Sequence, residues 1–298
     1  MKLNDIDRLF PTEDACKKAL QETRWPEKVH CPRCGLSLKV YALKTRPFHW
    51  VCKGCAKNGY RFSVLTGTIF ENTNAPLRTW FKVIYLMTTS KKGISAMQVQ
   101  RMIDPVRGKD AAWRTAWYMC HRIRAAMRDE TFRRLSGVVE MDETYVGGKL
   151  ENMHPAKRAE ARRKHYYGKT PVVGAIARKG NVVAKLVENT SAATLDAFMH
   201  ETVSDKVSLV ATDSALAYDY VDWQGRRHET VDHSKGEYVR GHVHTAHLDA
   251  FWSLLKRGIV GTFHQVSKKY LPLYLNEFSF RFNHRNDPDI FGAVVAGC

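Results

Sequence analysis

The sequence lacks several features that would place the protein in a membrane or outside the cell. No apolar run approaches the roughly 20 residues that a membrane-spanning helix needs. Asp5 and Asp7 interrupt the first residues, which is unlike a secretory signal peptide. Hydrophobic residues make up 44% and charged residues 26%, as is typical of a globular protein. We therefore expect a folded, cytoplasmic protein that does not associate with membranes.

Acidic residues are scarce relative to basic ones. Counts of 47 Lys and Arg against 30 Asp and Glu give a formal net charge of +17. This excess predicts a polyanionic partner, and nucleic acid is the first candidate. A membrane surface is the competing partner, but the basic residues are scattered over several segments instead of forming one amphipathic helix beside an anchor.

Four of the seven cysteines are paired by their spacing. Cys31 and Cys34 form one C-x-x-C knuckle, Cys52 and Cys55 form another, and seventeen residues separate the two pairs. Two such knuckles supply the four sulfurs that tetrahedral Zn²⁺ prefers. Two disulfides or four unrelated thiols are the alternative, but disulfides do not persist in a reducing compartment. The spacing predicts a structural zinc ribbon, preceded by a short helix, within residues 1–65.

Residues 66–135 show the apolar periodicity of helices and resemble a helix-turn-helix region. The segment that begins near Leu77 repeats apolar residues at helical spacing, and two further helices are predicted after it. The last of these carries Arg114, Arg122 and Arg124, as a helix in the major groove of double-stranded DNA would. A solvated basic face of an ordinary three-helix bundle is the alternative.

From residue 137 the pattern changes from helical to β. Strands are predicted at 138–146, 171–177, 182–187, 208–212 and 229–232, and helices at 192–203 and from about residue 245 onward. The order β-β-β-α-β-α-β-α indicates a mixed α/β fold of the ribonuclease-H-like kind, although several α/β folds share so coarse an order. We assign residues 136–298 to this catalytic domain.

Three aspartates lie where that topology would gather them at one end of the sheet. Asp142 is in the first strand, Asp213 directly follows the fourth, and Asp249 is on the last helical segment. Clustered carboxylates repel one another unless a cation lies between them, and Mg²⁺ accepts carboxylate oxygens readily. A role as a helix N-cap is the alternative for Asp213. Glu143 is expected on the opposite face of the strand and outside the site.

Several stretches together resemble bacterial insertion-sequence transposases of the DDE class with an N-terminal zinc ribbon, of the ISXO type. Besides the two knuckles, the resemblance is carried by F-S-V-L-T-G-T-I-F-E from Phe62, S-K-K-G-I-S-A from Ser90, M-D-E-T-Y-V-G-G-K from Met141, T-D-S from Thr212, F-W-S-L-L-K-R-G from Phe251 and N-E-F-S-F-R-F-N from Asn276. The resemblance implies a ribonuclease-H-like domain that cuts and joins DNA at the ends of a mobile element with a divalent metal, Mg²⁺ or Mn²⁺.

Carried over residue by residue, the resemblance makes Asp142 and Asp213 the first two catalytic ligands. The third position is usually Glu in the family, with Asn three residues before it, whereas this chain has Asp249 and Ala246. The aspartate reaches about 1.5 Å less far, which is one C–C bond. Lys256 lies two helical turns after Asp249, on the same face, where the family also has Lys.

Two-metal transesterification at phosphorus is the predicted chemistry, with no covalent enzyme intermediate. It needs no ATP, in agreement with the lack of Walker spacing around Gly147 and Gly148. A catalytically impaired, transposase-derived DNA-binding protein is the alternative, and an RNA-directed nuclease would not explain the helical region. A homo-oligomer on DNA is expected because transposition holds two DNA ends together.

Overall fold

The protein has two compact units in a computed structural model, in which residues 3–103, 112–128, 133–148, 151, 154–163, 169–178, 180–232, 235–237 and 239–298 are described. The first unit comprises Met1–Arg128 together with Asp287–Cys298, and the second comprises Asp129–Asn286. Among the described residues, no helix is long and apolar enough to cross a membrane.

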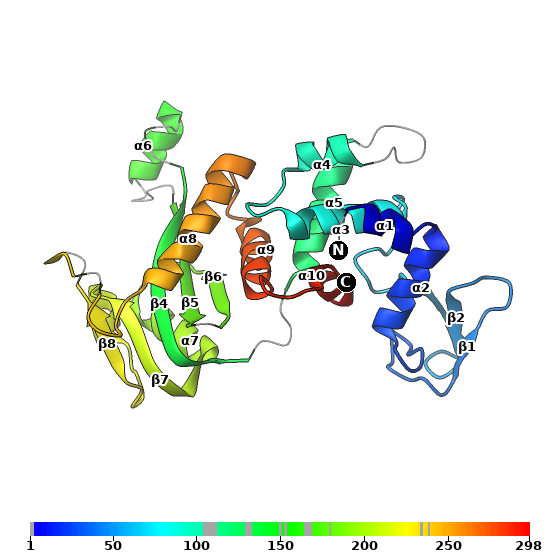
Figure 1. Ribbon diagram of the computed structural model, residues 1–298, viewed down its shortest axis with the longest axis horizontal. Helices are drawn as coiled ribbons and strands as arrows, with labels where there is room; N and C mark the ends of the chain where they lie inside the picture. Colours follow the sequence, from blue (N-terminus) through cyan, green and yellow to red (C-terminus); the bar gives the residue numbers. More distant parts are fainter. Residues whose placement is uncertain are drawn as a thin grey trace. The chain divides into compact units, whose positions relative to one another are not determined.

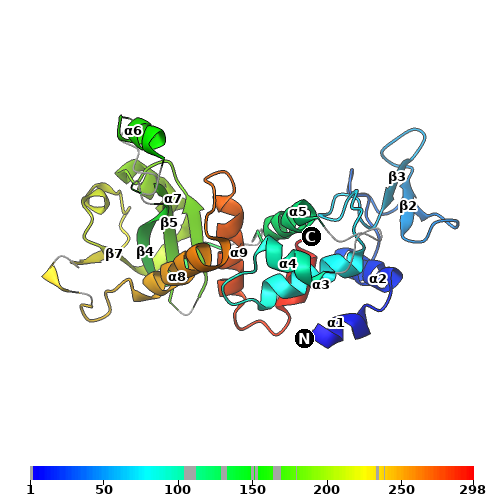
Figure 2. The ribbon, with the colours of Figure 1, turned by 90° about the horizontal axis from the view of Figure 1, so that it is seen from above.

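The first unit begins with two helices and a small antiparallel sheet. Helix α1 spans Leu3–Leu9 and α2 spans Glu13–Arg24. The N-cap of α2 is Thr12, whose side chain accepts a hydrogen bond from the amide of Ala15 at 3.1 Å. Strands β1 (Val40–Ala42), β2 (His49–Cys52) and β3 (Tyr60–Ser63) form the sheet in that order. The ribbon is therefore a short three-stranded meander, visible in Figures 1 and 2.

Three predicted helices follow in the same unit. They are α3 (Leu77–Thr89), α4 (Ala96–Met102) and α5 (Trp113–Ala126). Helix α3 starts directly after Pro76, and buries the apolar stripe that predicted it, including Trp80, Phe81 and Ile84. A proline suits this position because the first amides of a helix have no partner within the helix.

The last helix, α10 (Ile290–Ala296), differs from the predicted domain organisation. We predicted residues 136–298 as one domain, but the chain after Asn286 belongs to the first unit. There α10 packs on α2, α3 and α5. Phe291 stacks edge-on against Phe81 with ring centroids 5.5 Å apart. The physical reason is that α10 buries an apolar face, and its partners for that face lie on the helices of the first unit.

The second unit is built on a five-stranded mixed sheet. Its strands are β4 (Leu135–Gly147), β5 (Lys169–Ala177), β6 (Val182–Leu186), β7 (Val203–Asp213) and β8 (His228–Val231), in the spatial order β6-β5-β4-β7-β8. The first three strands are antiparallel neighbours, whereas β7 pairs in parallel with β4 and with β8. The observed strands follow the predicted order, and the mixed sheet is consistent with a ribonuclease-H-like domain.

Helices cover both faces of this sheet (Figures 1 and 2). One face packs against α7 (Ala192–Thr202) and the short 3₁₀ helix η2 (Leu216–Tyr220). The other packs against α8 (Ala246–Gly258), the π-helix η4 (Ile259–Phe263) and α9 (Leu271–Asn283). Helix α6 (Pro155–Arg163) lies between β4 and β5 in the sequence. The two cores use alternate residues of β5, as a strand buried on both faces requires.

Candidate active site and zinc centre

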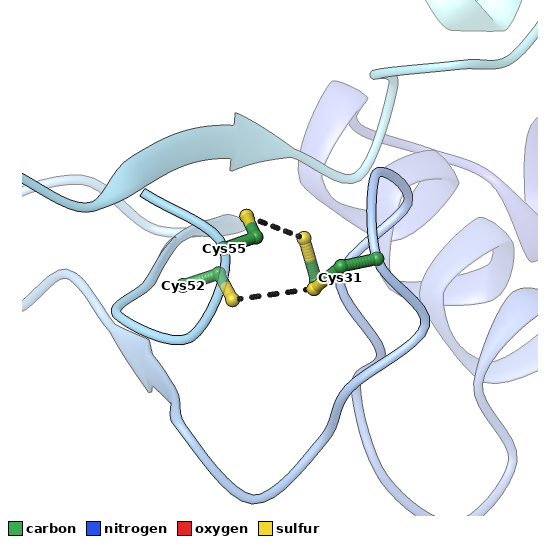
Figure 3. A group of neighbouring side chains, drawn as sticks. Cys31, Cys52 and Cys55 are labelled. Atoms are coloured by element: carbon green, nitrogen blue, oxygen red, sulfur yellow. Dashed lines mark hydrogen bonds between the residues drawn. The ribbon is translucent and has the colours of Figure 1, made fainter. Parts of the chain in front are cut away.

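The four predicted zinc ligands converge at the end of the ribbon. The sulfurs of Cys31 and Cys55 are 3.8 Å apart, those of Cys34 and Cys52 are 3.7 Å apart, and all four lie within 4.8 Å of one another. Figure 3 shows Cys31, Cys52 and Cys55 directed toward a common centre. A tetrahedral zinc ion with bonds of about 2.3 Å separates its sulfur ligands by about 3.8 Å. The cluster therefore fits a structural zinc ion.

Local backbone geometry builds each knuckle. The amide of Gly35 donates to the carbonyl of Cys31 at 2.9 Å, and the amide of Cys31 donates to the carbonyl of Leu36 at the same distance. Gly35 has φ +73°, a left-handed conformation that glycine adopts at little cost. The second knuckle begins at Cys52, the last residue of β2, which is paired with β1 on one side and β3 on the other.

The cysteine cluster is electrostatically suited to a cation. Desolvation raises the pKa of Cys55 to about 12, and hydrogen bonds with the other three thiols act in the same direction. Four thiolates at these distances repel one another strongly in the absence of a positive charge. A bound divalent cation would remove that penalty, so zinc binding would favour the folded ribbon.

The register of the large sheet brings two of the three predicted carboxylates together. Strands β4 and β7 are parallel with Glu140 beside Ala211, so the same register two residues later sets Asp142 beside Asp213, the last residue of β7. Residues two apart in a strand share a face. One carboxylate oxygen of each aspartate lies within 4.8 Å of the other. Two positions separated by 71 residues in the sequence thus meet at the carboxyl end of β7.

Glu143 joins these two aspartates, and our expectation that it would lie outside the site was wrong. A carboxylate oxygen of Glu143 lies within 4.8 Å of the oxygens of both Asp142 and Asp213. Alternation does direct adjacent strand residues to opposite faces. Strand β7 ends at Asp213, however, so β7 has no residue to lie beside Glu143, and alternation along β4 alone does not decide which carboxylates meet there.

The cluster of Asp142, Glu143 and Asp213 carries strong mutual repulsion. Burial, followed by the charges of Glu143, Asp213 and Asp249, raises the pKa of Asp142 to about 7, against a hydrogen bond from the Trp252 indole that lowers it. Burial also raises the pKa of Glu143, although the hydroxyl of Tyr218 donates to it at 2.9 Å. Near neutral pH this group of carboxyls needs either a proton or a cation. Its oxygens are the ligands that Mg²⁺ prefers.

The third predicted ligand and the predicted lysine are both on α8. Asp249 is exposed and lies outside the group of oxygens within 4.8 Å, although its charge contributes to the raised pKa of Asp142. Its Oδ2 accepts a hydrogen bond from the hydroxyl of Thr245 at 3.1 Å. Lys256 is exposed in the last turn of the same helix. Aspartate is shorter than the glutamate that the family usually has at this position, which is consistent with a carboxylate of Asp249 that lies outside the group formed by Asp142, Glu143 and Asp213.

A close fit between α8 and the sheet holds Trp252 against Asp142. The Nε1 atom of Trp252 donates to Oδ2 of Asp142 at 2.9 Å. Gly174 of β5 is the register partner of Asp142, and a Cβ atom there would lie 2.6 Å from the Trp252 ring. Because real Cβ contacts are never that short, only glycine at 174 admits the indole in this position. Trp252 thus connects the helix to the strand that carries the first aspartate.

The basic residues of α5 divide into exposed and buried ones. Arg114 is exposed, whereas Arg122 is half-buried and donates to the carbonyl of Thr68 at 3.0 Å. Arg124 is only 2% exposed, and its guanidinium lies 3.2 Å from the ring of His121. The prediction that Arg124 would face DNA was therefore wrong. The position is one turn from the buried Cys120, so it shares the inward face of the helix.

Comparison with known proteins assigns both units. A model of the ISXO2-like transposase domain matches residues 134–283, which lie within the second unit. A model of the transposase zinc-ribbon domain matches residues 11–58 of the first unit. Because the first match covers half of the chain, the protein belongs to the ISXO2-like transposase family. The family and the zinc-ribbon domain that we predicted from the sequence are confirmed.

Individual relatives agree with this membership. An uncharacterized protein in transposable element ISH50 of Halobacterium salinarum is 28% identical over 284 residues, covering 92% of each chain. An uncharacterized transposase-like protein of Haemophilus influenzae is 31% identical over 106 residues, covering 36% of this chain and 84% of its own. A simian T-cell lymphotropic virus intasome, solved in complex with PP2A regulatory subunit B56 gamma, aligns over 55% of this chain and 60% of its own, at 14% identity with a TM-score of 0.29.

Three residues around the site were not predicted from the sequence pattern. Glu143 was excluded by strand alternation, and Tyr218 and Trp252 were not considered as neighbours of the acidic residues. For Trp252 a signal was available, because it lies three residues after Asp249 and therefore near it on the surface of a helix. Tyr218 is in a short 3₁₀ helix that propensity does not identify.

Proposed function

We propose that the protein is a DNA transposase that cuts and joins the ends of an insertion sequence by two-metal phosphodiester transesterification. Family membership supports the transposase assignment. The observation that carries the chemistry is the meeting of Asp142, Asp213 and Glu143 within 4.8 Å at the end of β7. Such a group of half-buried, mutually repelling carboxylates fits divalent cations with oxygen ligands.

In this proposal Asp142 and Asp213 are the catalytic ligands, and Asp249 is the third from α8. Divalent cations bound there would lower the pKa of an attacking water or 3′-hydroxyl and stabilise the leaving oxygen. Asp142 must lose its proton to serve as a ligand, and its raised pKa makes that step sensitive to pH near neutrality. Lys256, on the same helix, would pair with a DNA phosphate or orient the carboxylate of Asp249.

Double-stranded DNA is the proposed substrate and partner. A net charge of +17 favours a polyanion, and the matched zinc ribbon belongs to transposases. We propose that the ribbon and the helices α3, α4 and α5 bind the element end, with Arg114 and Arg122 as phosphate contacts. The reaction joins two DNA ends, so we also propose a homo-oligomer on DNA.

Incubation of the purified protein with labelled element-end DNA tests the catalytic proposal. With Mg²⁺ or Mn²⁺ we expect nicked or joined strands, and no product with a chelator. Asp142→Asn and Asp213→Asn should abolish product formation while DNA binding is retained, because these substitutions remove ligand charge without changing side-chain size. Glu188→Gln, at an exposed position of the same unit, is the matched control and should retain activity. Full activity of the two aspartate variants would show that the assignment is wrong.

A catalytically impaired DNA-binding protein is the alternative function, and two observations favour it. Asp249 lies outside the 4.8 Å group of oxygens, and Ala246 replaces the Asn that is common in the family. This alternative predicts salt-dependent DNA binding with no strand chemistry under any divalent metal. Asp249→Glu separates the two functions, since the longer side chain should restore or increase strand chemistry if reach limits the native enzyme. An inactive wild type that gains activity with Asp249→Glu would establish impairment at this one position.

A further inference from the structure

Strand β4 carries a further carboxylate, that of Glu140, which is fully buried beside the proposed site and contacts other residues than the acidic cluster does. Glu140 is 0% exposed and lies two residues before Asp142, on the same face of the strand. Its Oε1 accepts from the Nε of Arg178 at 2.8 Å and lies 2.8 Å from Nδ1 of His247. Its Oε2 accepts from the backbone amides of His247 at 2.9 Å and Leu248 at 3.2 Å. Both oxygens are therefore engaged by donors.

The two backbone amides that donate to Glu140 show that its side chain caps the N-terminus of α8. The helix begins at Ala246 with Thr245 as its N-cap, and the Thr245 side chain makes no capping hydrogen bond. The amides of His247 and Leu248 are the second and third of the helix, which are the ones a capping side chain normally satisfies. Glu140 supplies this cap from a strand 107 residues earlier in the sequence. A negative charge at this end also interacts favourably with the helix dipole.

A metal site is the competing interpretation of the same residues. Ligand atoms of Glu140, His244 and His247 lie within 4.8 Å of one another, which is close enough for one ion. The guanidinium of Arg178 argues against it, because a permanent positive charge already occupies Oε1 of Glu140. A cation at Oε1 would have to displace this guanidinium, while the other oxygen, Oε2, is already occupied by two backbone N–H donors. The donors around Glu140 favour a structural tie between strand and helix.

The tie lies next to the proposed catalytic ligands on both sides. On β4 only one residue separates Glu140 from Asp142, and on α8 the capped residue Leu248 directly precedes Asp249. We propose that Glu140 is a positioning residue that fixes α8 on β4 and thereby sets the place of Asp249 relative to Asp142. This inference rests on the proposed function. It adds to the proposed site a residue that contacts neither the metal nor the DNA.

Hydrogen–deuterium exchange and Mn²⁺ binding in the full-length, zinc-loaded protein test the proposal. Glu140→Ala removes every acceptor, whereas Glu140→Gln keeps one oxygen for the amides and loses the charge that Arg178 pairs with. We expect faster exchange in a peptide covering residues 244–252 for both variants, more so for alanine. Exchange in 169–177 of β5 should be unchanged, and Glu188→Gln should match the wild type throughout. If Glu140→Ala does not fold, Glu140→Gln decides the question alone.

The affinity of the proposed site for Mn²⁺, measured from the EPR signal of the free ion, tests whether Glu140 affects metal binding. Loss of a residue that orients metal ligands typically weakens binding by about 10- to 100-fold, and we expect an effect of that order for Glu140→Gln. A merely structural role would lower the folded fraction without a specific coupling to Asp249. A double-mutant cycle distinguishes the two: in an Asp249→Asn background, Glu140→Gln should have little further effect on affinity.

The outcomes separate this proposal from the proposed function. Wild-type exchange at 244–252 in Glu140→Gln, or additive effects in the cycle with Asp249→Asn, would overturn the positioning role. Unchanged Mn²⁺ binding in Asp142→Asn would instead overturn the proposed metal site. In that case the exchange data alone would decide whether Glu140 holds α8, with faster exchange supporting the tie and unchanged exchange refuting it.

Discussion

The zinc centre and the acidic cluster are both groups of ligands that repel one another, but the chain assembles them differently. The four cysteines lie within residues 31–55, and turns such as the one at Gly35 bring them together. The carboxylates of Asp142 and Asp213 come from two strands and meet only because β4 and β7 pair in one particular register. One site is specified by local spacing, whereas the other depends on the tertiary fold.

This difference has an energetic counterpart. The ribbon has strands of only three or four residues, so we expect its stability to depend on a bound metal. The acidic cluster instead lies on a sheet that is packed by helices on both faces, which holds the carboxylates together against their repulsion. Metal should therefore be required for folding in the first unit and only for charge balance in the second.

Removal of zinc should have the largest effect. Structural zinc contributes about 10–16 kcal/mol in comparable modules, more than a small sheet supplies on its own. A strong chelator should abolish amide protection in β2 and β3 while protection in β4 and β5 is retained, as measured by hydrogen–deuterium exchange. Metal analysis should give one zinc per chain before treatment, and added zinc should restore protection. Retained protection in a ribbon shown to be free of zinc would contradict the prediction.

Divalent metal should stabilise the second unit in a pH-dependent way. The pKa of Asp142 is raised from 3.8 to about 7, so the folded state holds an extra proton between these values. Without metal, the free energy of unfolding therefore falls as pH rises through this window, because the unfolded state releases the proton more readily. The ionised cluster is the form that binds Mg²⁺, so the metal-induced rise in Tm should be small at pH 5.5 and larger at pH 8. At about 100 times its Kd the ion contributes about 2.7 kcal/mol.

Asp142→Asn is the matched control for this pH dependence. Asparagine keeps an oxygen for the Trp252 indole and removes one of the repelling charges. The variant should have a higher Tm than the wild type at pH 8 without metal, and a much smaller response to Mg²⁺. An equal metal-induced shift at pH 5.5 and pH 8 in the wild type would show that ionisation of Asp142 does not control binding.

A smaller effect is expected where α8 meets the sheet. In Gly174→Ala the new Cβ would lie 2.6 Å from the Trp252 ring, so the indole must shift away from Asp142. Overpacking of this kind costs about 1–3 kcal/mol, measurable by denaturant unfolding. Gly261→Ala in η4 is the control, because a Cβ there meets nothing within 4 Å. Equal stability of the two variants would show that the fit around Trp252 is looser than the distances indicate.

Much of the fold was predictable because the strands carry clear patterns. The predicted segments 138–146 and 171–177 lie within β4 and β5, since β-branched residues run through both. The pair Asp142 and Asp213 was predicted from the strand order together with the zinc module, the positive charge and the family resemblance. Glu143 was not, because alternation predicts the face of a residue but not where the neighbouring strand ends. The position of α10 was not predictable either, because the apolar pattern of a helix shows that one face is buried but not which core that face packs against.

The arginines of α5 show the same limit on a helix and give the smallest predicted effect. If Arg114 contacts a DNA phosphate, Arg114→Ala should weaken DNA binding a few-fold. The slope of the logarithm of the binding constant against the logarithm of the salt concentration should decrease by about one. Arg124→Ala should instead destabilise the first unit, because this arginine is 2% exposed and lies against His121. Fluorescence anisotropy between 50 and 200 mM salt measures the first effect, and thermal unfolding measures the second. An unchanged salt slope in Arg114→Ala would remove Arg114 from the proposed phosphate contacts and leave Arg122 as the remaining proposed contact on α5.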